Sequence, residues 1–523
     1  MSEQRQAQLN RGGPASSVIG TQDDAVLQRP SSSPACDVAQ LPAARSALGK
    51  RAKTVSGRVP GNVDASDLAG CRGKQSTADI VLERDQPLHV RERVARLRRF
   101  QMQDTAARLA GNRLGRDNRL HKDRVADCLR RLSDVASGVE CRYNPARESG
   151  YLKGLQTCGS VWHCPVCAAK ISNGRREELA RLNSAHVAAG GSVWMTTYTI
   201  SHGRETDLAE LLRRVLEARR KMKAGRAGIR RREQFGVVGT VSVLEVTWSP
   251  RHGWHPHIHE LVFSSDPNMD PGAYDAEMRP AWRDAAAAQG LTMNSHGFKI
   301  DRTFGAVADY IAKFGYEPES AMPWGVESEM AKGHIKQARE KDGMTPFGLL
   351  AAATDGLDWA ESLWQEYCRV FKGRKQLTYS PGLKKLYGET EISDEELAAQ
   401  GDEGEDLTLV EITPAQWDMV VEARARGGLH ELVQTGRPGV IIAGLAEIGV
   451  EVKPCDMVGW RARSPGGEGE IEQIYPNAYA PGGWRCWLVH DGPARVRHVY
   501  TLLDIEILGS GSRERAELLA EVS

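Results

Sequence analysis

Apolar and polar residues follow two different periods between residues 190 and 316. Residues 193–201, 237–248 and 258–263 are rich in β-branched and aromatic residues, which is the pattern of β-strands. Residues 207–223 instead repeat apolar positions every three or four residues, as an amphipathic helix does. The order strand, helix, strand, strand predicts an α+β domain.

A turn-rich piece with the sequence SPRHGWHP joins the last two of these strands. Two strands joined by so short a piece pair antiparallel, so we expect a hairpin that turns about Arg251. Beyond the hairpin, the helical period returns in four stretches, at residues 271–288, 306–314, 328–341 and 359–372.

The N-terminal part of the chain divides into two regions. Residues 1–85 are rich in Ser, Ala, Gly, Gln and Arg without a sustained apolar period, so we expect them to be disordered. Residues 86–140 form a basic helical region, with thirteen Arg and Lys against five acids between Arg91 and Arg131. Such a run is either a solvated helix face or an arm that contacts phosphates.

The C-terminal part begins with an acidic stretch. Residues 388–412 hold ten acids and no Lys or Arg, and we interpret residues 388–455 as an acidic linker followed by a helical segment. In residues 456–510, short β-rich runs are separated by the turn sequences SPGGEG, NAYAPGG and HDGPAR. This spacing predicts a small β-barrel, and we expect an SH3-like one.

Composition narrows the class of protein. No apolar run reaches the length of a membrane span, and the N-terminus MSEQRQAQLNRGG lacks the apolar core of a secretory signal, so we expect a cytoplasmic protein. The formal net charge is only +1, but a polyanion responds to local charge density, which varies strongly along this chain.

The strongest local pattern is GWHPHIHELVF at residues 253–263. Because side chains alternate along a strand, His257 and His259 lie on one face. In a hairpin that turns about Arg251, Glu245 lies opposite His257 and completes a set of two nitrogens and a carboxylate, which suits Mg or Mn. The alternative is a packing accident or a hydrogen-bonded pair of core histidines.

The second pattern is GAVADYIAKFGYE at residues 305–317, in which a helix places Tyr310 and Lys313 on one face. A tyrosine hydroxyl is a weak nucleophile at neutral pH. A metal ion that polarises a phosphate and a nearby ammonium group make its in-line attack feasible. We therefore take Tyr310 and Lys313 as candidate catalytic residues; the alternative is a half-buried aromatic beside a solvated charge.

Four cysteines, Cys141, Cys158, Cys164 and Cys167, supply the closed set of thiolates that is typical of structural zinc. The last two form the motif CPVC, and His163 is an alternative to one of the four ligands. We therefore expect a cysteine-rich zinc element at residues 141–189. The alternative is that CPVC is redox-active or only buried.

HPHIH at residues 255–259 and YIAKF at residues 310–314 together resemble the signature of HUH endonucleases, the rolling-circle replication initiators of plasmids and phages. TTYTISH, at residues 196–202, resembles the first-strand motif of that family. WHCPVCAAKI and GRKQLTYSPGLK resemble segments that flank the core in bacterial plasmid Rep proteins. The resemblance covers about residues 141–385.

The resemblance implies an antiparallel sheet of about five strands with packed helices, an HUH catalytic domain that we place at residues 190–387. It implies that His257 and His259 bind a divalent ion and that Tyr310 cleaves single-stranded DNA at a replication origin. The enzyme would keep the 5′ phosphate as a phosphotyrosine and later rejoin the strand. Origin DNA, a host helicase and a host polymerase are the expected partners, in the bacterial cytoplasm.

Two positions depart from the family pattern. A second tyrosine four residues after the first is replaced by Phe314, and a glutamate four residues before it is replaced by Ala306. The sequence therefore leaves open how the reaction terminates. A conjugative relaxase or a transposase of the same chemistry is the alternative enzyme, and a zinc-dependent DNA-binding regulator without activity is the alternative from another class.

Overall fold

The computed structural model of the chain describes residues 88–110, 112–114, 120–204, 206–302, 343–399, 406–478, 480, 483–491 and 496–509. All of them belong to one unit, Asn62–Ser523. The region expected to be disordered, residues 1–85, lies outside the described residues. The expected helices at 306–314 and 328–341 also lie outside them, and so do Tyr310 and Lys313.

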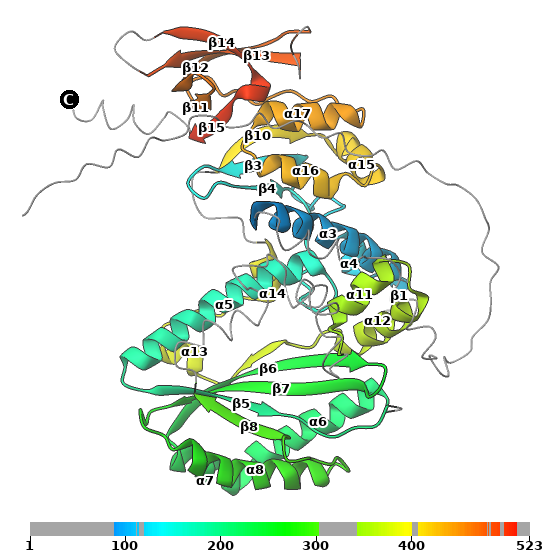
Figure 1. The fold of residues 1–523 in the computed structure, drawn as a ribbon, viewed down its shortest axis with the longest axis vertical. Helices are drawn as coiled ribbons and strands as arrows, with labels where there is room; N and C mark the ends of the chain where they lie inside the picture. The colour runs from blue at the N-terminus through cyan, green and yellow to red at the C-terminus, as the bar shows by residue number, and fades with distance from the viewer. Residues whose placement is uncertain are drawn as a thin grey trace, which may run out of the picture. The chain divides into compact units, whose positions relative to one another are not determined.

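Five antiparallel strands form one sheet, in the order β8, β5, β7, β6, β9 (Figure 1). The expected hairpin is confirmed, because β6 and β7 pair from Val237 opposite Ser264 to Ser249 opposite Gly253. Gly253 has a φ of +70°, a conformation that L side chains rarely adopt. The strands are β5 (Ser192–Tyr198), β6 (Val237–Ser249), β7 (Gly253–Ser264), β8 (Phe298–Arg302) and β9 (Leu377–Tyr379).

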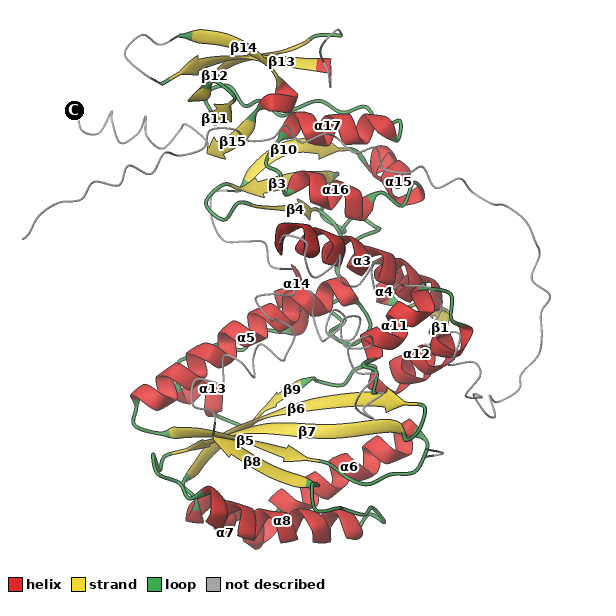
Figure 2. Ribbon diagram, in the orientation of Figure 1, coloured by secondary structure: helices red, strands yellow, loops and turns green. Residues whose placement is uncertain are grey.

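Two helices, α6 (Leu208–Lys223) and α8 (Pro271–Ala287), lie along one face of this sheet (Figure 2). α6 begins where the side chain of Asp207 accepts a hydrogen bond from a backbone N–H of the first turn. Tyr198 of β5 and Trp282 of α8 are both fully buried, with ring centroids 5.4 Å apart. Burial of each such ring contributes roughly 1.5–3 kcal/mol. Both rings belong to a hydrophobic cluster that holds more residues than the cluster on the other face.

The opposite face of the sheet is covered in part by α5 (Pro165–Ala188). Leu179 and Leu182 of α5 are buried in one cluster with Val243 and Leu261 of the sheet. Side chains alternate across a strand, so residues 257 and 259 of β7 lie on this same face.

A second sheet has three antiparallel strands, in the order β10, β3, β4. Its strands are β3 (Val139–Asn144), β4 (Ser149–Lys153) and β10 (Leu407–Ile412), followed by the helices α15 (Pro414–Glu422), α16 (Arg426–Val433) and α17 (Pro438–Glu447). β3 thus pairs with β10, a strand from the segment interpreted as a linker, and the linker prediction does not hold for residues 407–412. Pairing between strands so distant in sequence leaves no local signal.

A third sheet at the C-terminal end has five antiparallel strands, in the order β14, β13, β12, β11, β15. The strands are β11 (Arg461–Ser464), β12 (Gly467–Pro476), β13 (Trp484–His490), β14 (Arg497–Thr501) and β15 (Glu506–Gly509), with a short 3-10 helix, η3 (Leu502–Asp504), before the last. Ala462, Ile471 and Leu488 are fully buried between the strands. The expected α+β class with antiparallel sheets is therefore confirmed.

The basic helical region contains α3 (Leu88–Leu109). Three of its arginines form ion pairs with acids of distant elements: Arg96 with Glu431, Arg98 with Asp355 and Arg108 with Glu361. These side chains contribute to packing between elements. The remaining elements are β1 (Asn112–Leu114), β2 (Leu120–Lys122), α4 (Arg124–Asp127), α7 (Gly225–Gln234), α11 (Pro346–Thr354), α12 (Asp358–Phe371), α13 (Leu383–Leu386) and α14 (Asp394–Ala399).

Among the helices of the described ranges, none is long and apolar enough to cross a bilayer.

Candidate functional site

Two histidines and a glutamate converge on the sheet face that α5 partly covers. Glu245 of β6 lies directly opposite His257 of β7, and His259 follows two positions later. Glu245 Oε2 is 2.7 Å from His257 Nε2 and 3.2 Å from His259 Nε2. One ligand atom from each residue lies within 4.8 Å of the other two. The structure thus brings together the three residues that the sequence singled out as ligands of a catalytic ion.

The other nitrogen of each imidazole is held by a second group. His257 Nδ1 lies 3.2 Å from the backbone oxygen of His255, and His259 Nδ1 lies 3.0 Å from Thr197 Oγ1. A ring that donates its Nδ1 proton to an oxygen keeps the lone pair on Nε2, the atom that faces Glu245. Histidine ligands of metal ions are commonly oriented in this way, so the two rings are already turned for coordination.

The charges at this site fit a cation. Burial raises the pKa of the Glu245 carboxyl, but His259 and His257 outweigh that effect and hold it well below its usual range. Burial lowers the pKa of His257, yet the hydrogen bond and charge of Glu245 raise it above its ordinary value. The three side chains are only 14 to 19% exposed. A divalent ion would take the place of the contacts that the carboxylate now makes with the two imidazoles.

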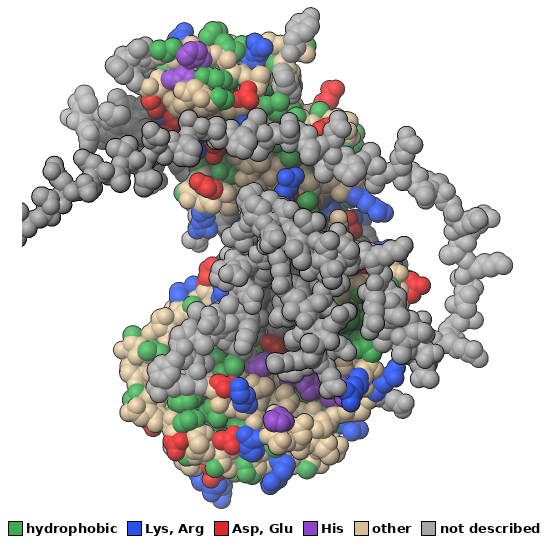
Figure 3. Space-filling view, in the orientation of Figure 1, with side chains coloured by type: hydrophobic (Ala, Val, Ile, Leu, Met, Phe, Trp, Pro, Cys, Tyr) green, Lys and Arg blue, Asp and Glu red, His purple; other side chains and the backbone are tan. Residues whose placement is uncertain are grey.

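The row of histidines continues along β7 and beyond it. His255 Nδ1 is 2.7 Å from Nε2 of His202, and the two rings are 4.8 Å apart. Burial and the neighbouring imidazoles lower the pKa of His255 to about 4, so its ring is neutral near pH 7. Figure 3 shows histidine side chains gathered over the sheet of β5–β9. His202 and His255 extend the polar surface beside the three converging residues.

Tyr310 and Lys313 lie outside the described residues, so their role as nucleophile and cation stays a prediction. β8 ends at Arg302, eight residues before Tyr310 in the sequence.

Four buried cysteines form a second cluster. Their sulfur atoms are 3.5 to 3.7 Å apart where Cys128 meets Cys164 and Cys167, and 3.6 Å apart between Cys158 and Cys167. A tetrahedral zinc site with Zn–S bonds of about 2.3 Å has sulfurs about 3.8 Å apart, so the spacing fits the ion. The cluster can therefore hold a metal such as zinc.

Local structure explains how Cys164 and Cys167 are positioned. Cys164 is the N-cap of α5, Pro165 occupies the first turn, and the Cys167 N–H donates to Cys164 Sγ. Gln103 of α3 also donates to this sulfur, at 3.4 Å. Burial opposes ionisation of Cys164, but hydrogen bonds from the neighbouring thiols and the amide hold the pKa of its thiol well below the usual range.

The prediction that Cys141 is the fourth thiol of this cluster was wrong, because Cys128 occupies that place. Cys141 lies in the middle of β3, opposite Leu152 of β4, and is fully buried in a different hydrophobic cluster. Burial, and to a smaller extent the neighbouring Cys455, raises the pKa of its thiol, as expected for a packed cysteine without a cationic partner. Its neighbours Val139 and Tyr143 alternate with it on the strand, and this apolar period was the signal that could have excluded it.

Two functional candidates were missed from the sequence. Cys128 lies 30 residues upstream of Cys158, within the basic region, where a lone cysteine carries no motif. Thr197 belongs to TTYTISH, but only the pairing of β5 with β7 shows that it contacts His259.

Comparison with known proteins adds a second line of observation. The chain is 29% identical over 360 residues to "Protein rep" of Streptomyces lividans, a match that covers 55% of this chain and 77% of that protein. The chain resembles a Rep protein. This similarity confirms the resemblance to bacterial plasmid Rep proteins. A "Neomycin resistance protein" of Streptomyces cyanogenus is 28% identical over 133 residues, 21% of this chain and 30% of that protein. No family model and no solved structure matches the chain.

The described part of the chain therefore contains two metal-ligand clusters of opposite character. The cysteine cluster is closed and fully buried, which suits a structural ion. The Glu245 cluster offers three ligands from one sheet face, fewer than the four or more that divalent ions take.

Proposed function

We propose that this chain is a rolling-circle replication initiator of the HUH endonuclease type, which nicks and rejoins one DNA strand at a plasmid origin. The convergence of Glu245, His257 and His259 on one sheet face carries the proposal. The similarity to a Rep protein supports it independently. The HUH fold at residues 190–387 and the SH3-like form of residues 456–510 are parts of the same proposal.

In this mechanism Tyr310 attacks the scissile phosphorus, and the bond from phosphorus to the 3′ oxygen breaks. The Tyr310 hydroxyl releases its proton to water as its oxygen bonds to phosphorus, and the leaving 3′ oxygen takes up a proton from water to become a hydroxyl. The 5′ phosphate stays on Tyr310, which conserves the bond energy for rejoining. A Mg or Mn ion held by the three ligands would act as a Lewis acid on the phosphate. Glu245 and the two imidazoles orient the site, and Lys313 offers an ammonium group to the developing charge.

The proposal implies partners and a second ion. The free 3′ hydroxyl would prime a host polymerase, and a host helicase would separate the strands. Zinc in the cysteine cluster would stabilise the fold next to the sheet without entering the reaction, because a closed four-thiolate site leaves no position for phosphate.

Plasmid nicking tests the proposal. The purified chain is mixed with a supercoiled plasmid that carries its own replication origin, with and without Mn, and relaxation is followed on a gel. We expect Mn-dependent relaxation by the wild type and a loss of at least 100-fold with His257→Ala. His296→Ala is the matched control, because His296 is exposed and outside the cluster. Absence of relaxation by the wild type, or full activity of His257→Ala, would refute the nuclease assignment.

A further inference from the structure

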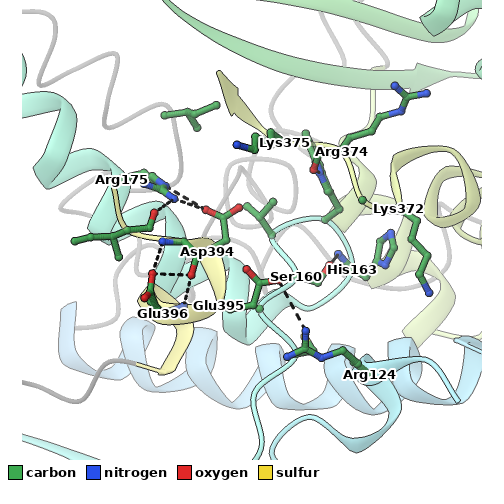
Figure 4. Close-up of a pocket in the computed structure, with 18 of the residues that line it drawn as sticks. Arg124, Ser160, His163, Arg175, Lys372, Arg374, Lys375, Asp394, Glu395 and Glu396 are labelled. Carbon is green, nitrogen blue, oxygen red and sulfur yellow. Dashed lines mark hydrogen bonds and ion pairs between the residues drawn. The ribbon is translucent and has the colours of Figure 1, made fainter. Parts of the chain in front are cut away.

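A cavity of about 1000 Å³ lies between the cysteine cluster and the sheet (Figure 4). One wall is the loop from Cys158 to His163, which connects two of the clustered thiols. The residues that line the other walls come from four segments: Asp123–Val125, Arg175 of α5, Lys372–Lys375 with Leu377 and Tyr379 of β9, and Lys384 with Glu391–Glu396.

Two residues that line the cavity belong to the sheet face that carries the candidate metal ligands. Val243 of β6 pairs with His259 on one side and with Leu377 of β9 on the other. Residues opposite each other in a sheet share a face, so Leu377 and Tyr379 line the cavity on the same face as His259. Two strand spacings, about 10 Å, separate His259 from Leu377. A few nucleotides of a DNA strand cover this distance.

Some basic side chains around the cavity form ion pairs with acids, and others do not. Arg175 pairs with Asp394 at 2.7 Å, and Lys372 pairs with Asp123 at 2.5 Å. Lys375 is exposed and makes no ion pair with any residue of the described ranges. It is therefore available to a phosphate of a ligand.

The loop that carries Lys375 lets a ligand approach the backbone. Gly373 in this loop has a φ of +73°, and a side chain added there would meet nothing within 4 Å. The neighbouring Arg374 makes no ion pair within the described ranges and donates its Nε–H to the backbone oxygen of Val370. The loop thus presents positive charge beside open space, the combination that a DNA backbone requires.

His163 supplies a second and independent indication of a ligand. Its side chain lines the cavity and is only 7% exposed. Its Nε2 atom is buried and has no hydrogen-bond partner among the described residues. Buried polar atoms normally have a partner, so an unsatisfied one at a cavity wall indicates a group that binds there.

We propose that this cavity binds one or two nucleotides of the single DNA strand next to the scissile phosphate, with Lys375 on a phosphate and His163 on a base. The inference rests on the proposed nuclease function and assigns part of its substrate to a second site. The cysteine cluster then has a structural role in substrate binding, because Cys158 and Cys164 fix both ends of the loop that carries His163.

Fluorescence anisotropy with a labelled 16-nucleotide oligo-dT, without added Mg or Mn, tests the site on the full chain. We expect Lys375→Glu to weaken binding about tenfold and to reduce the slope of log affinity against log salt by about 0.7, the loss of one single-strand phosphate contact. Lys385→Glu is the matched control, since Lys385 is exposed, lies on α13 and is not part of the cavity wall. The affinity of Lys385→Glu for the oligonucleotide should stay within twofold of that of the wild type.

Photocrosslinking with 4-thiothymidine in the same oligonucleotide gives a measurement that needs no variant. Crosslinks should map to the peptides that contain residues 158–163 or 372–379. Equal losses in Lys375→Glu and Lys385→Glu, or crosslinks confined to other peptides, would overturn the proposal. Plasmid nicking without crosslinks in the cavity refutes this site alone, and crosslinks in the cavity without nicking refute the nuclease assignment alone.

Discussion

Glu245 and His257 face each other across the long hairpin, with the carboxylate oxygen 2.7 Å from the imidazole nitrogen. Both side chains are polar, yet they are only 14% and 19% exposed, so each depends on the other for a hydrogen-bond partner. A pair of this kind is stable without metal through a shared proton and becomes a chelating pair when a divalent ion displaces that proton.

Replacement of Glu245 tests its role as the third ligand. We expect Glu245→Gln to need at least tenfold more Mn for half-maximal nicking, because an amide oxygen is a weaker and uncharged ligand. The measurement is the Mn titration of nicking rate. Glu233→Gln, on an exposed residue of α7, is the control. An unchanged titration in Glu245→Gln would assign the third ligand elsewhere, with His255 or His202 as the next candidates.

Thr197 is a positioning residue, because it contacts His259 and no expected reacting atom. We expect Thr197→Val to lower the affinity for Mn about tenfold, as loss of an outer hydrogen bond to a ligand usually does, and Thr197→Ser to restore it. Thr378→Val, on an exposed threonine of β9, should leave metal affinity unchanged. If Thr197→Val lowers the rate at saturating Mn but not the affinity, the contact does not orient a metal ligand.

Substitution of Cys128 and of Cys141 should have opposite effects on the zinc content of the protein. Metal analysis of protein purified under reducing conditions should give about one zinc per chain, and Cys128→Ser should lose it, since a buried thiolate ligand is removed. Cys141→Ser should keep the zinc, because Cys141 lies in another cluster. Zinc retained in Cys128→Ser and lost in Cys141→Ser would reverse the assignment.

The buried carboxylate of Glu260 should make the free energy of unfolding depend on pH. Its carboxylate is 1% exposed and contacts Arg219 at 2.6 Å and Lys223 at 2.8 Å. Burial raises its pKa, but the two cations outweigh this effect and lower it to about 2, from 4.5 for an unperturbed glutamate. A depressed folded-state pKa stabilises the fold above the unfolded value, and this stability is lost as pH falls from about 4.5 to about 2.

The shift at Glu260 corresponds to a stability on the order of 3 kcal/mol at neutral pH. Glu260→Gln should therefore lower the thermal midpoint at pH 7, and the difference from the wild type should shrink as pH falls below 4.5. Thermal unfolding of both proteins from pH 7 to pH 3 measures this trend. A difference that stays constant over this range would show that the ion pairs do not stabilise the fold.

The hairpin site was predictable from the sequence because every constraint on it is local. The turn near Arg251 fixes the register, and alternation along the strands fixes the face. Residues at equal distances from the turn lie opposite each other, so the sequence alone predicted that Glu245 faces His257. Register and face depend only on residues within the hairpin.

The long-range features could not be predicted in this way. Cys128 and Cys141 were equally isolated in the sequence. Cys128 reaches the cluster because α4, which ends beside it, packs on α3, and α3 packs on α5. Strand β10 pairs with β3, which lies more than 260 residues earlier in the sequence. The acidic composition of the segment that contains β10 therefore suggested a linker. The cavity likewise collects residues from segments far apart in the chain, which no spacing rule connects.

The covalent adduct tests the central claim most directly. The wild type, Tyr310→Phe and Tyr316→Phe are incubated with Mn and a single-stranded oligonucleotide that spans the origin, and the products are digested and analysed by mass spectrometry. The account predicts a 5′-phosphotyrosine adduct on Tyr310 in the wild type and in Tyr316→Phe, and none in Tyr310→Phe. A full amount of adduct in Tyr310→Phe, or an adduct on another residue, would contradict it.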